Sequence, residues 1–209
     1  MKSSIIGLLV ILLVSLVFVA ADESNFISDL LEEFPGVYEF RKYAANQYCF
    51  GNNNFKCNSQ GKITEIQIEN INQNGHVPVS ISTLTELHKI DISNSSIELD
   101  WNNINNIKKL DILIFSGNKH KIVKFPTLTI DLKYLDLSNT RFDGELTKLP
   151  STLLYINISN TGLTGSIPSF INNPNLRYFD VSNNKLKGDL PDFDRTNLLI
   201  LNASNNMLN

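Results

Sequence analysis

Apolar residues recur along residues 63–209 in a pattern that repeats every 21 to 24 residues. Counted from its first apolar residue, each copy is apolar at steps one, four and six. In the stretch LKYLDLSNTRFDGEL (132–146), these steps are Leu132, Leu135 and Leu137. The alternation predicts a short strand with one buried face. The other copies begin at Ile63, Leu87, Leu110, Leu153, Leu176 and Leu198.

The seven copies are expected to stack as coils, because one coil alone cannot bury its apolar face. Strands at steps three to five would then pair in parallel, about 4.8 Å apart. A period in the low twenties with this apolar pattern is the signature of leucine-rich repeats. The predicted fold class is therefore an α/β solenoid: a right-handed leucine-rich-repeat superhelix with a parallel β-sheet on its concave face.

The residues after each strand also follow the period. An amide or hydroxyl at step nine can bond backbone groups that the turn leaves unpaired. Ile71 occupies this step in the first coil and cannot form such a bond, so the row of step-nine hydrogen bonds is expected to be irregular there. Trp101 falls at step fifteen, which predicts core packing rather than a ligand platform. The polar residues at step nine are Ser95, Asn118, Thr140, Thr161, Asn184 and Asn206. Step thirteen holds glycines that permit a turn, namely Gly144, Gly165 and Gly188.

The first 21 residues are predicted to be a secretory signal peptide. Lys2 precedes the apolar run IIGLLVILLVSLVFVA, and cleavage after Ala21 would place Val19 and Ala21 at the two positions that a signal peptidase reads. The alternative is an uncleaved membrane anchor, for which the run is at the short limit of length. No second apolar run follows, so no membrane span is expected after signal cleavage, and the chain is predicted to be secreted.

Residues 22–62 are predicted to form an N-terminal cap on the first coil. NFISDLLEEF (25–34) suits an amphipathic helix that Pro35 and Gly36 would end, and VYEFRKYAANQY (37–48) suits a second one. Cys49 and Cys57 are the two cysteines of the chain. In a secreted protein a disulfide between them is the expected state, and free thiols are the alternative.

The stretch CFGNNNFKCNSQGKITEIQI (49–68) resembles the cysteine-paired N-terminal cap of plant-type leucine-rich-repeat ectodomains. NTGLTGSIP (160–168) and NKLKGDLP (184–191) resemble the later repeats of the same class. The cysteine spacing is one residue longer than usual, the tryptophan common between the cysteines is absent, and repeats one to three lack the Gly-x-Ile-Pro segment. The resemblance implies a receptor-like ectodomain, a co-receptor, or an inhibitor of cell-wall-degrading glycosidases such as polygalacturonase.

Nothing in the sequence predicts an enzyme, a metal site or a cofactor. The nucleophile, phosphate-loop and zinc-protease motifs are absent. His76, His88 and His120 are isolated in sequence, and the pair Asp192 and Asp194 reads as solvated. A net charge of −3 without a basic cluster argues against nucleic acid as a partner.

The repeat map does predict a recognition surface. Tyr134, Tyr155 and Tyr178 share step three, and Tyr is favoured at recognition sites. The alternative is that these tyrosines only stabilise the strands. The neighbouring step five holds Asp136, Asn157 and Asp180. Acceptor sequons for N-glycosylation occur at Asn94, Asn157 and Asn202, and a glycan on Asn157 would block the surface.

The sequence therefore predicts an extracellular, non-enzymatic module that binds a protein, peptide or glycan through the concave face. An inhibitor of a secreted glycan-degrading hydrolase is the main alternative. The last coil stops at Asn209, step twelve, without a clear C-terminal cap, which fits either a natural terminus or a truncated relative of a receptor. A natural terminus would leave Leu198, Leu201 and Leu208 available for end-to-end pairing of two molecules.

Overall fold

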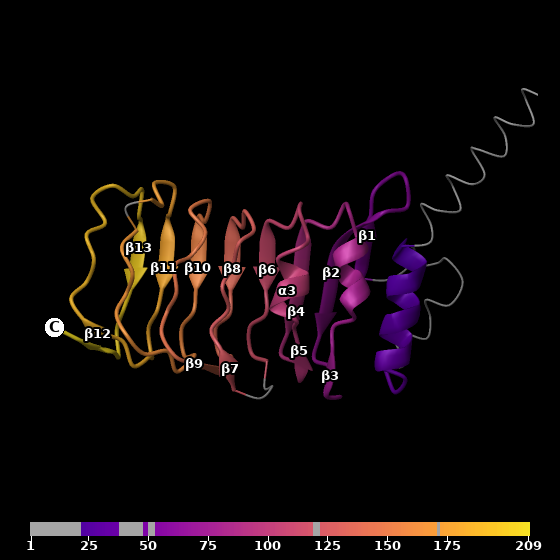
Figure 1. The fold of residues 1–209 in the computed structure, drawn as a ribbon, viewed down its shortest axis with the longest axis horizontal. Helices are drawn as coiled ribbons and strands as arrows, with labels where there is room; N and C mark the ends of the chain where they lie inside the picture. Colours follow the sequence, from indigo (N-terminus) through magenta and orange to yellow (C-terminus); the bar gives the residue numbers. More distant parts are fainter. Residues whose placement is uncertain (1–21, 38–47, 50–52, 119–121, 171) are drawn as a thin grey trace, which may run out of the picture.

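The computed structural model describes residues 22–37, 48–49, 53–118, 122–170 and 172–209. A sheet of eight strands runs along the solenoid, one strand per coil after the first hairpin (Figure 1). β1 pairs with β2 in antiparallel fashion, and every later pair in this sheet is parallel. In spatial order the strands are β1 (Phe55–Cys57), β2 (Ile63–Glu69), β4 (Lys89–Ser93), β6 (Ile112–Ile114), β8 (Tyr134–Asp136), β10 (Tyr155–Asn157), β11 (Tyr178–Asp180) and β13 (Ile200–Asn202).

The register of the sheet confirms the predicted period. Leu135 pairs with Ile156, and Ile156 pairs with Phe179, so step four forms one continuous column. The side chains at steps one, four and six of these three coils are wholly buried. The column runs through Ile66, Ile90, Leu113, Leu135, Ile156, Phe179 and Leu201. Stacking thus builds the core that no single coil could form.

Step nine bonds the backbone between coils, as predicted. The Asn184 amide donates to the carbonyl oxygens of Ile158 (2.8 Å) and Val181 (3.0 Å) in two different coils. The Thr161 hydroxyl donates to Ile158 O at 3.0 Å, so a hydroxyl does part of the same work. In the first coil, the side chain of Ile71 offers no such bond, and the Ile71 N–H instead donates to Ser95 Oγ at 3.0 Å.

Step eight has a backbone role that the sequence analysis missed. Six non-glycine residues of the described segments have positive φ, from 51° to 59°, and all are asparagines at step eight. Asparagine tolerates this left-handed conformation better than most residues. Gly117, at φ 68°, fills the same step in the third coil. The asparagines are Asn70, Asn94, Asn139, Asn160, Asn183 and Asn205.

The connections between strands differ along the solenoid. The first two coils carry short helices, η1 (Val79–Thr83) and α3 (Trp101–Ile104), whereas the described parts of the later connections contain no helix. The predicted turn glycines Gly144, Gly165 and Gly188 have φ of 94°, 79° and 82°, a region that disfavours side chains. The shorter paired strands are β3 (Gly75–His76) with β5 (Ile97–Glu98), β7 (Val123–Lys124) with β9 (Phe142–Asp143), and β12 (Lys187–Gly188) with β14 (Met207–Leu208).

Trp101 packs into the core, as its step predicts. Its ring lies 5.9 Å from that of Phe115 and 6.2 Å from that of Phe142, centroid to centroid. The Asp100 carboxylate accepts a hydrogen bond from the Asn102 N–H (2.9 Å) and so caps the start of α3. Trp101 therefore bridges three successive coils.

The N-terminal segment forms a helix over residues 22–33, beside the first coil (Figure 1). Its buried Phe26 meets Phe55 of β1 edge to face, with ring centroids 6.3 Å apart. The predicted disulfide between Cys49 and Cys57 is present. The predicted signal peptide and most of the second predicted helix lie outside the described residues. No helix in the described ranges is long and apolar enough to span a membrane.

Candidate ligand-binding face

Tyr134, Tyr155 and Tyr178 form a stacked row, here called the tyrosine ladder. They come from β8, β10 and β11 and pair directly across the sheet. The ring centroids are 4.1 Å apart for Tyr134 and Tyr155 and 4.3 Å apart for Tyr155 and Tyr178. The ring planes differ by 3° and 8°. This spacing is close to that between strands, so the parallel register itself sets the stack.

The stack determines which part of each ring a ligand can reach. Because both neighbours lie within 4.3 Å and nearly parallel, the two faces of Tyr155 are covered by Tyr134 and Tyr178. The ladder thus offers ring edges and hydroxyl groups along one line. A sugar that packs flat on an aromatic face has no place on Tyr155, whereas carbonyl oxygens and apolar side chains can contact hydroxyls and edges.

The step-five residues beside the ladder have a structural task that sequence reasoning missed. Asp136 Oδ1 accepts the Ser138 N–H at 2.9 Å, and Asp180 Oδ1 accepts the Ser182 N–H at 2.9 Å. Asn157 Oδ1 accepts the Ser159 N–H at 3.1 Å in the same way. Each side chain therefore closes an Asx turn at the end of its strand. The Ser two residues later in each coil is the sequence signal that could have indicated this turn.

Asp180 is tied further into the sheet. Its Oδ2 accepts a hydrogen bond from the Asn202 amide at 3.0 Å and contacts the Tyr178 hydroxyl at 3.5 Å. Asp180 therefore links the hydroxyl of Tyr178, the last tyrosine of the ladder, to Asn202 on the next strand. The predicted site residues thus do lie together, in two adjacent columns three coils long, with Asn157 in the middle of the second column.

The ladder hydroxyls stay protonated over the whole physiological pH range. Burial, with a smaller contribution from neighbouring ladder groups, raises the pKa of Tyr155 and of Tyr178 from 10.0 to about 12. Burial is also the main cause that raises the pKa of Tyr134. The ladder is therefore a neutral row of hydrogen-bonding groups beside two carboxylates.

The raised pKa values predict a loss of stability at alkaline pH. The unfolded chain would release the hydroxyl protons of Tyr155 and Tyr178 near pH 10, and the folded chain only near pH 12, so unfolding is favoured as pH rises through this window. Below pH 10 the contribution is fully present. Urea unfolding across the window should show a falling free energy of unfolding, and replacing all three ladder tyrosines with Phe should flatten the slope. An unchanged slope in that variant would contradict the prediction.

Toward the N-terminus, the sheet face that bears the ladder carries both acidic and basic side chains. Asp111 accepts a hydrogen bond from Lys133 Nζ at 3.0 Å and lies 3.9 Å from His88 Nδ1. Asp91 is buried and accepts a hydrogen bond from Ser93 Oγ at 3.0 Å. Burial, more than any neighbouring charge, raises the pKa of Asp91.

Among the other chemistry-bearing residues of the described segments, one histidine stands between two glutamates. His76, isolated in sequence, lies between Glu33 (Nδ1 to Oε1, 3.7 Å) and Glu98 (Nε2 to Oε2, 3.3 Å) and links the N-terminal helix to the first coils. Within the segments that the structure describes, no group of three or more His, Cys, Asp or Glu residues could hold a metal ion. Asp192 and Asp194 are exposed, as predicted.

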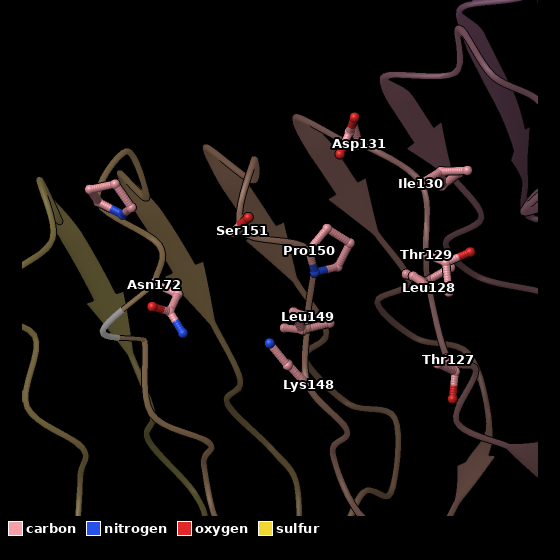
Figure 2. Close-up of a pocket in the computed structure, with 11 residues that line it drawn as sticks. Thr127, Leu128, Thr129, Ile130, Asp131, Lys148, Leu149, Pro150, Ser151 and Asn172 are labelled. Carbon is pink, nitrogen blue, oxygen red and sulfur yellow. The ribbon is translucent and has the colours of Figure 1, made fainter.

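A groove of about 800 Å³ lies on the connections, away from the ladder (Figure 2). It crosses the segments that precede β8, β10 and β11, and no ladder residue lines it. Its lining mixes apolar and polar side chains, among them Leu128, Asp131, Lys148, Leu149 and Asn172.

Comparison with known proteins agrees with the fold. The family model described as Leucine Rich Repeat matches residues 131–154, 152–174 and 175–195. Receptor-like protein 45 of Arabidopsis thaliana is 30% identical over 117 residues, which are 53% of this chain but only 12% of that protein. The chain therefore spans about an eighth of that relative's length.

Solved structures of plant receptors share this fold. The crystal structure of a pollen receptor kinase 3 superposes with a TM-score of 0.63 at 22% identity, over 77% of this chain and 83% of that one. The plant peptide hormone receptor RGFR1, solved in complex with RGF2, gives 0.51 at 21% identity, over 64% of this chain and 27% of that one. The fold is thus a leucine-rich-repeat solenoid. More particularly, the chain resembles the leucine-rich-repeat ectodomains of plant receptors, including the cysteine pair in the N-terminal region.

Proposed function

We propose that this chain is an extracellular, non-enzymatic binding module that recognises a peptide segment of its partner along the exposed face of the sheet. The observation that carries the proposal is the tyrosine ladder, stacked at 4.1 and 4.3 Å beside the column of Asp136, Asn157 and Asp180. The three half-buried tyrosines bring neutral hydroxyls in a row next to Asp136 and Asp180, and each spacing is set by the sheet.

The covered ring faces favour a peptide over a glycan. An extended peptide presents carbonyl oxygens, N–H groups and side chains at regular intervals, which a row of hydroxyls and carboxylates can bond. The stacked tyrosines are also held in place before binding, so little side-chain freedom is lost when a ligand arrives. The likeness to RGFR1, described as a peptide hormone receptor, is consistent with this use of the fold.

The extracellular setting is supported by the predicted signal peptide, by the disulfide between Cys49 and Cys57, and by the likeness to receptor ectodomains. The non-enzymatic role is supported by the sheet face itself, where the carboxylates of Asp136 and Asp180 are engaged in strand turns. Catalysis would need groups that are free to exchange protons with a substrate.

Cross-linked capture from extracellular fluid of the source organism tests the proposal. The secreted chain with its ladder intact should recover a partner whose cross-linked segment is a peptide. Changing all three ladder tyrosines to Ser should lower recovery at least tenfold, because truncating the central contacts of an interface removes most of its binding energy. Changing them all to Phe keeps the stack and shows how much of the loss belongs to the hydroxyls.

The groove lined by Lys148 and Asn172, to which no ladder residue contributes, supplies the matched control. Replacing Lys148 and Asn172 with Ala changes exposed side chains of that groove and leaves the ladder untouched. This variant should capture the partner as well as the unaltered chain does. Equal capture by the Ser variant, provided that it is folded by circular dichroism, would show that the ladder only stabilises strands.

A further inference from the structure

Of the three glycosylation sequons, Asn94 differs from the others in its surroundings. It lies at step eight, in the exposed turn after β4, with φ of 51°. Elsewhere at this step, side-chain amides bond each other across coils: Asn160 Nδ2 donates to Asn139 Oδ1, and Asn205 Nδ2 donates to Asn183 Oδ1, each at 2.9 Å.

In the following coil the neighbour of Asn94 at this step is Gly117, which has no side chain to pair with it. A Cβ atom on Gly117 would lie 2.3 Å from Asn94 Oδ1, so the Asn94 side chain occupies the space that a larger residue would need. The backbone N–H of Asn94 donates to the Ser116 carbonyl oxygen at 2.8 Å, but its side-chain nitrogen Nδ2 makes no hydrogen bond to any residue in the described part of the chain. It is therefore exposed and unengaged.

The other two sequons lie in strands of the sheet, and their asparagines are half-buried. Asn202 Nδ2 donates to Asp180 Oδ2 at 3.0 Å, and Asn202 Oδ1 accepts from Ser204 Oγ at 2.7 Å. Asn157 lies half-buried within a strand, and Asp136 and Asp180 pair with it on either side. A sugar on either amide nitrogen would have to displace side chains of the sheet face.

We propose that Asn94 carries an N-linked oligosaccharide and that Asn157 and Asn202 do not. The donor would be an oligosaccharide linked through pyrophosphate to a lipid. The bond from the sugar C1 to the phosphate oxygen breaks, C1 bonds to Asn94 Nδ2, that nitrogen loses one proton, and the lipid pyrophosphate leaves. Ser96 supplies the hydroxyl that the sequon requires.

The position of this glycan suits the exposed face. Asn94 follows β4, and the ladder begins on β8, with β6 between them in the sheet. Asn94 also stands at the turn beyond the strand, not on the strand itself. The sugar would therefore cover the edge of the second and third coils and leave the three tyrosines open.

The test is site-resolved mass spectrometry of the full chain, secreted from a eukaryotic host. Enzymatic deglycosylation in heavy-oxygen water marks each formerly occupied Asn as labelled Asp, and the label is expected at residue 94 alone. Asn94→Gln and Ser96→Ala should each abolish the gel shift on deglycosylation. Ser96→Ala matters because it leaves the left-handed Asn94 in place. Asn157→Gln and Asn202→Gln should keep the full shift.

Three results would overturn the inference. The first is an unlabelled residue 94 in the secreted chain, and the second is a label at Asn157 or Asn202. The third is a chain that never enters the secretory pathway of the host, because the donor is found only there.

Discussion

Replacing Asn184 with Ala is expected to lower the free energy of unfolding by about 3–5 kcal/mol, because several buried backbone groups lose their partner together. Asn184 Oδ1 accepts hydrogen bonds from the N–H groups of Thr161, Gly162 and Leu163 at 2.9 to 3.1 Å. Its amide donates to carbonyl oxygens of two coils, at Ile158 and Val181. Alanine satisfies none of these groups, and the site is buried from water.

The chain offers two matched controls for this change. Asn175→Ala removes the same amide from an exposed turn and should cost less than about 1 kcal/mol. Asn184→Thr should lie between the two, because Thr161 already shows at the same step that a hydroxyl reaches one carbonyl oxygen. Urea unfolding gives the free energies, and hydrogen exchange should show the amides of Gly162 and Leu163 losing protection. Equal costs for Asn184→Ala and Asn175→Ala would show that the step-nine hydrogen bonds of Asn184 contribute little to stability.

The period of the apolar residues was sufficient to predict the sheet. Steps one, four and six fix which side chains face inward, and a common step places residues of successive coils in one column, as Leu135, Ile156 and Phe179 show. Strand pairing needs no further information, because coils of nearly equal length can stack in only one register without exposing the core.

What the period could not give are conformations that depend on a local side-chain contact. Asn139 and Asn160 occupy the left-handed turn and bond each other, which the apolar period alone does not predict. The signal was present: step eight is Asn or Gly in every coil. The Asx turns of Asp136 and Asp180 were missed because an exposed carboxylate in a column suggested binding before backbone capping.

The ladder shows the same limit. The period predicts that Tyr134, Tyr155 and Tyr178 share one column, but it does not predict the orientation of their rings. The structure shows ring planes that differ by only 3° and 8° between neighbouring tyrosines. That orientation covers both faces of the Tyr155 ring, and it is the reason for preferring a peptide ligand to a glycan.

Phe179→Ala is expected to cost about 3–5 kcal/mol, the range found when a buried Phe is truncated and a cavity is left behind. Phe179 is wholly buried at step four, and its ring lies 4.7 Å from that of Phe170 and 6.2 Å from that of Phe193. The rigid connections on either side cannot close over the space, because the neighbouring coils hold them in register.

Leu201→Ala is the matched control, since Leu201 occupies the next place in the same column but is 38% exposed. Part of its surface is already in water, so the loss should be about 1–2 kcal/mol. Thermal and urea unfolding of both variants measure the difference. If the buried step-four column stabilises the stack of coils, Phe179→Ala must lower the free energy of unfolding more than Leu201→Ala does. An equal or larger loss for Leu201→Ala would mean that the last strand contributes most of the stability.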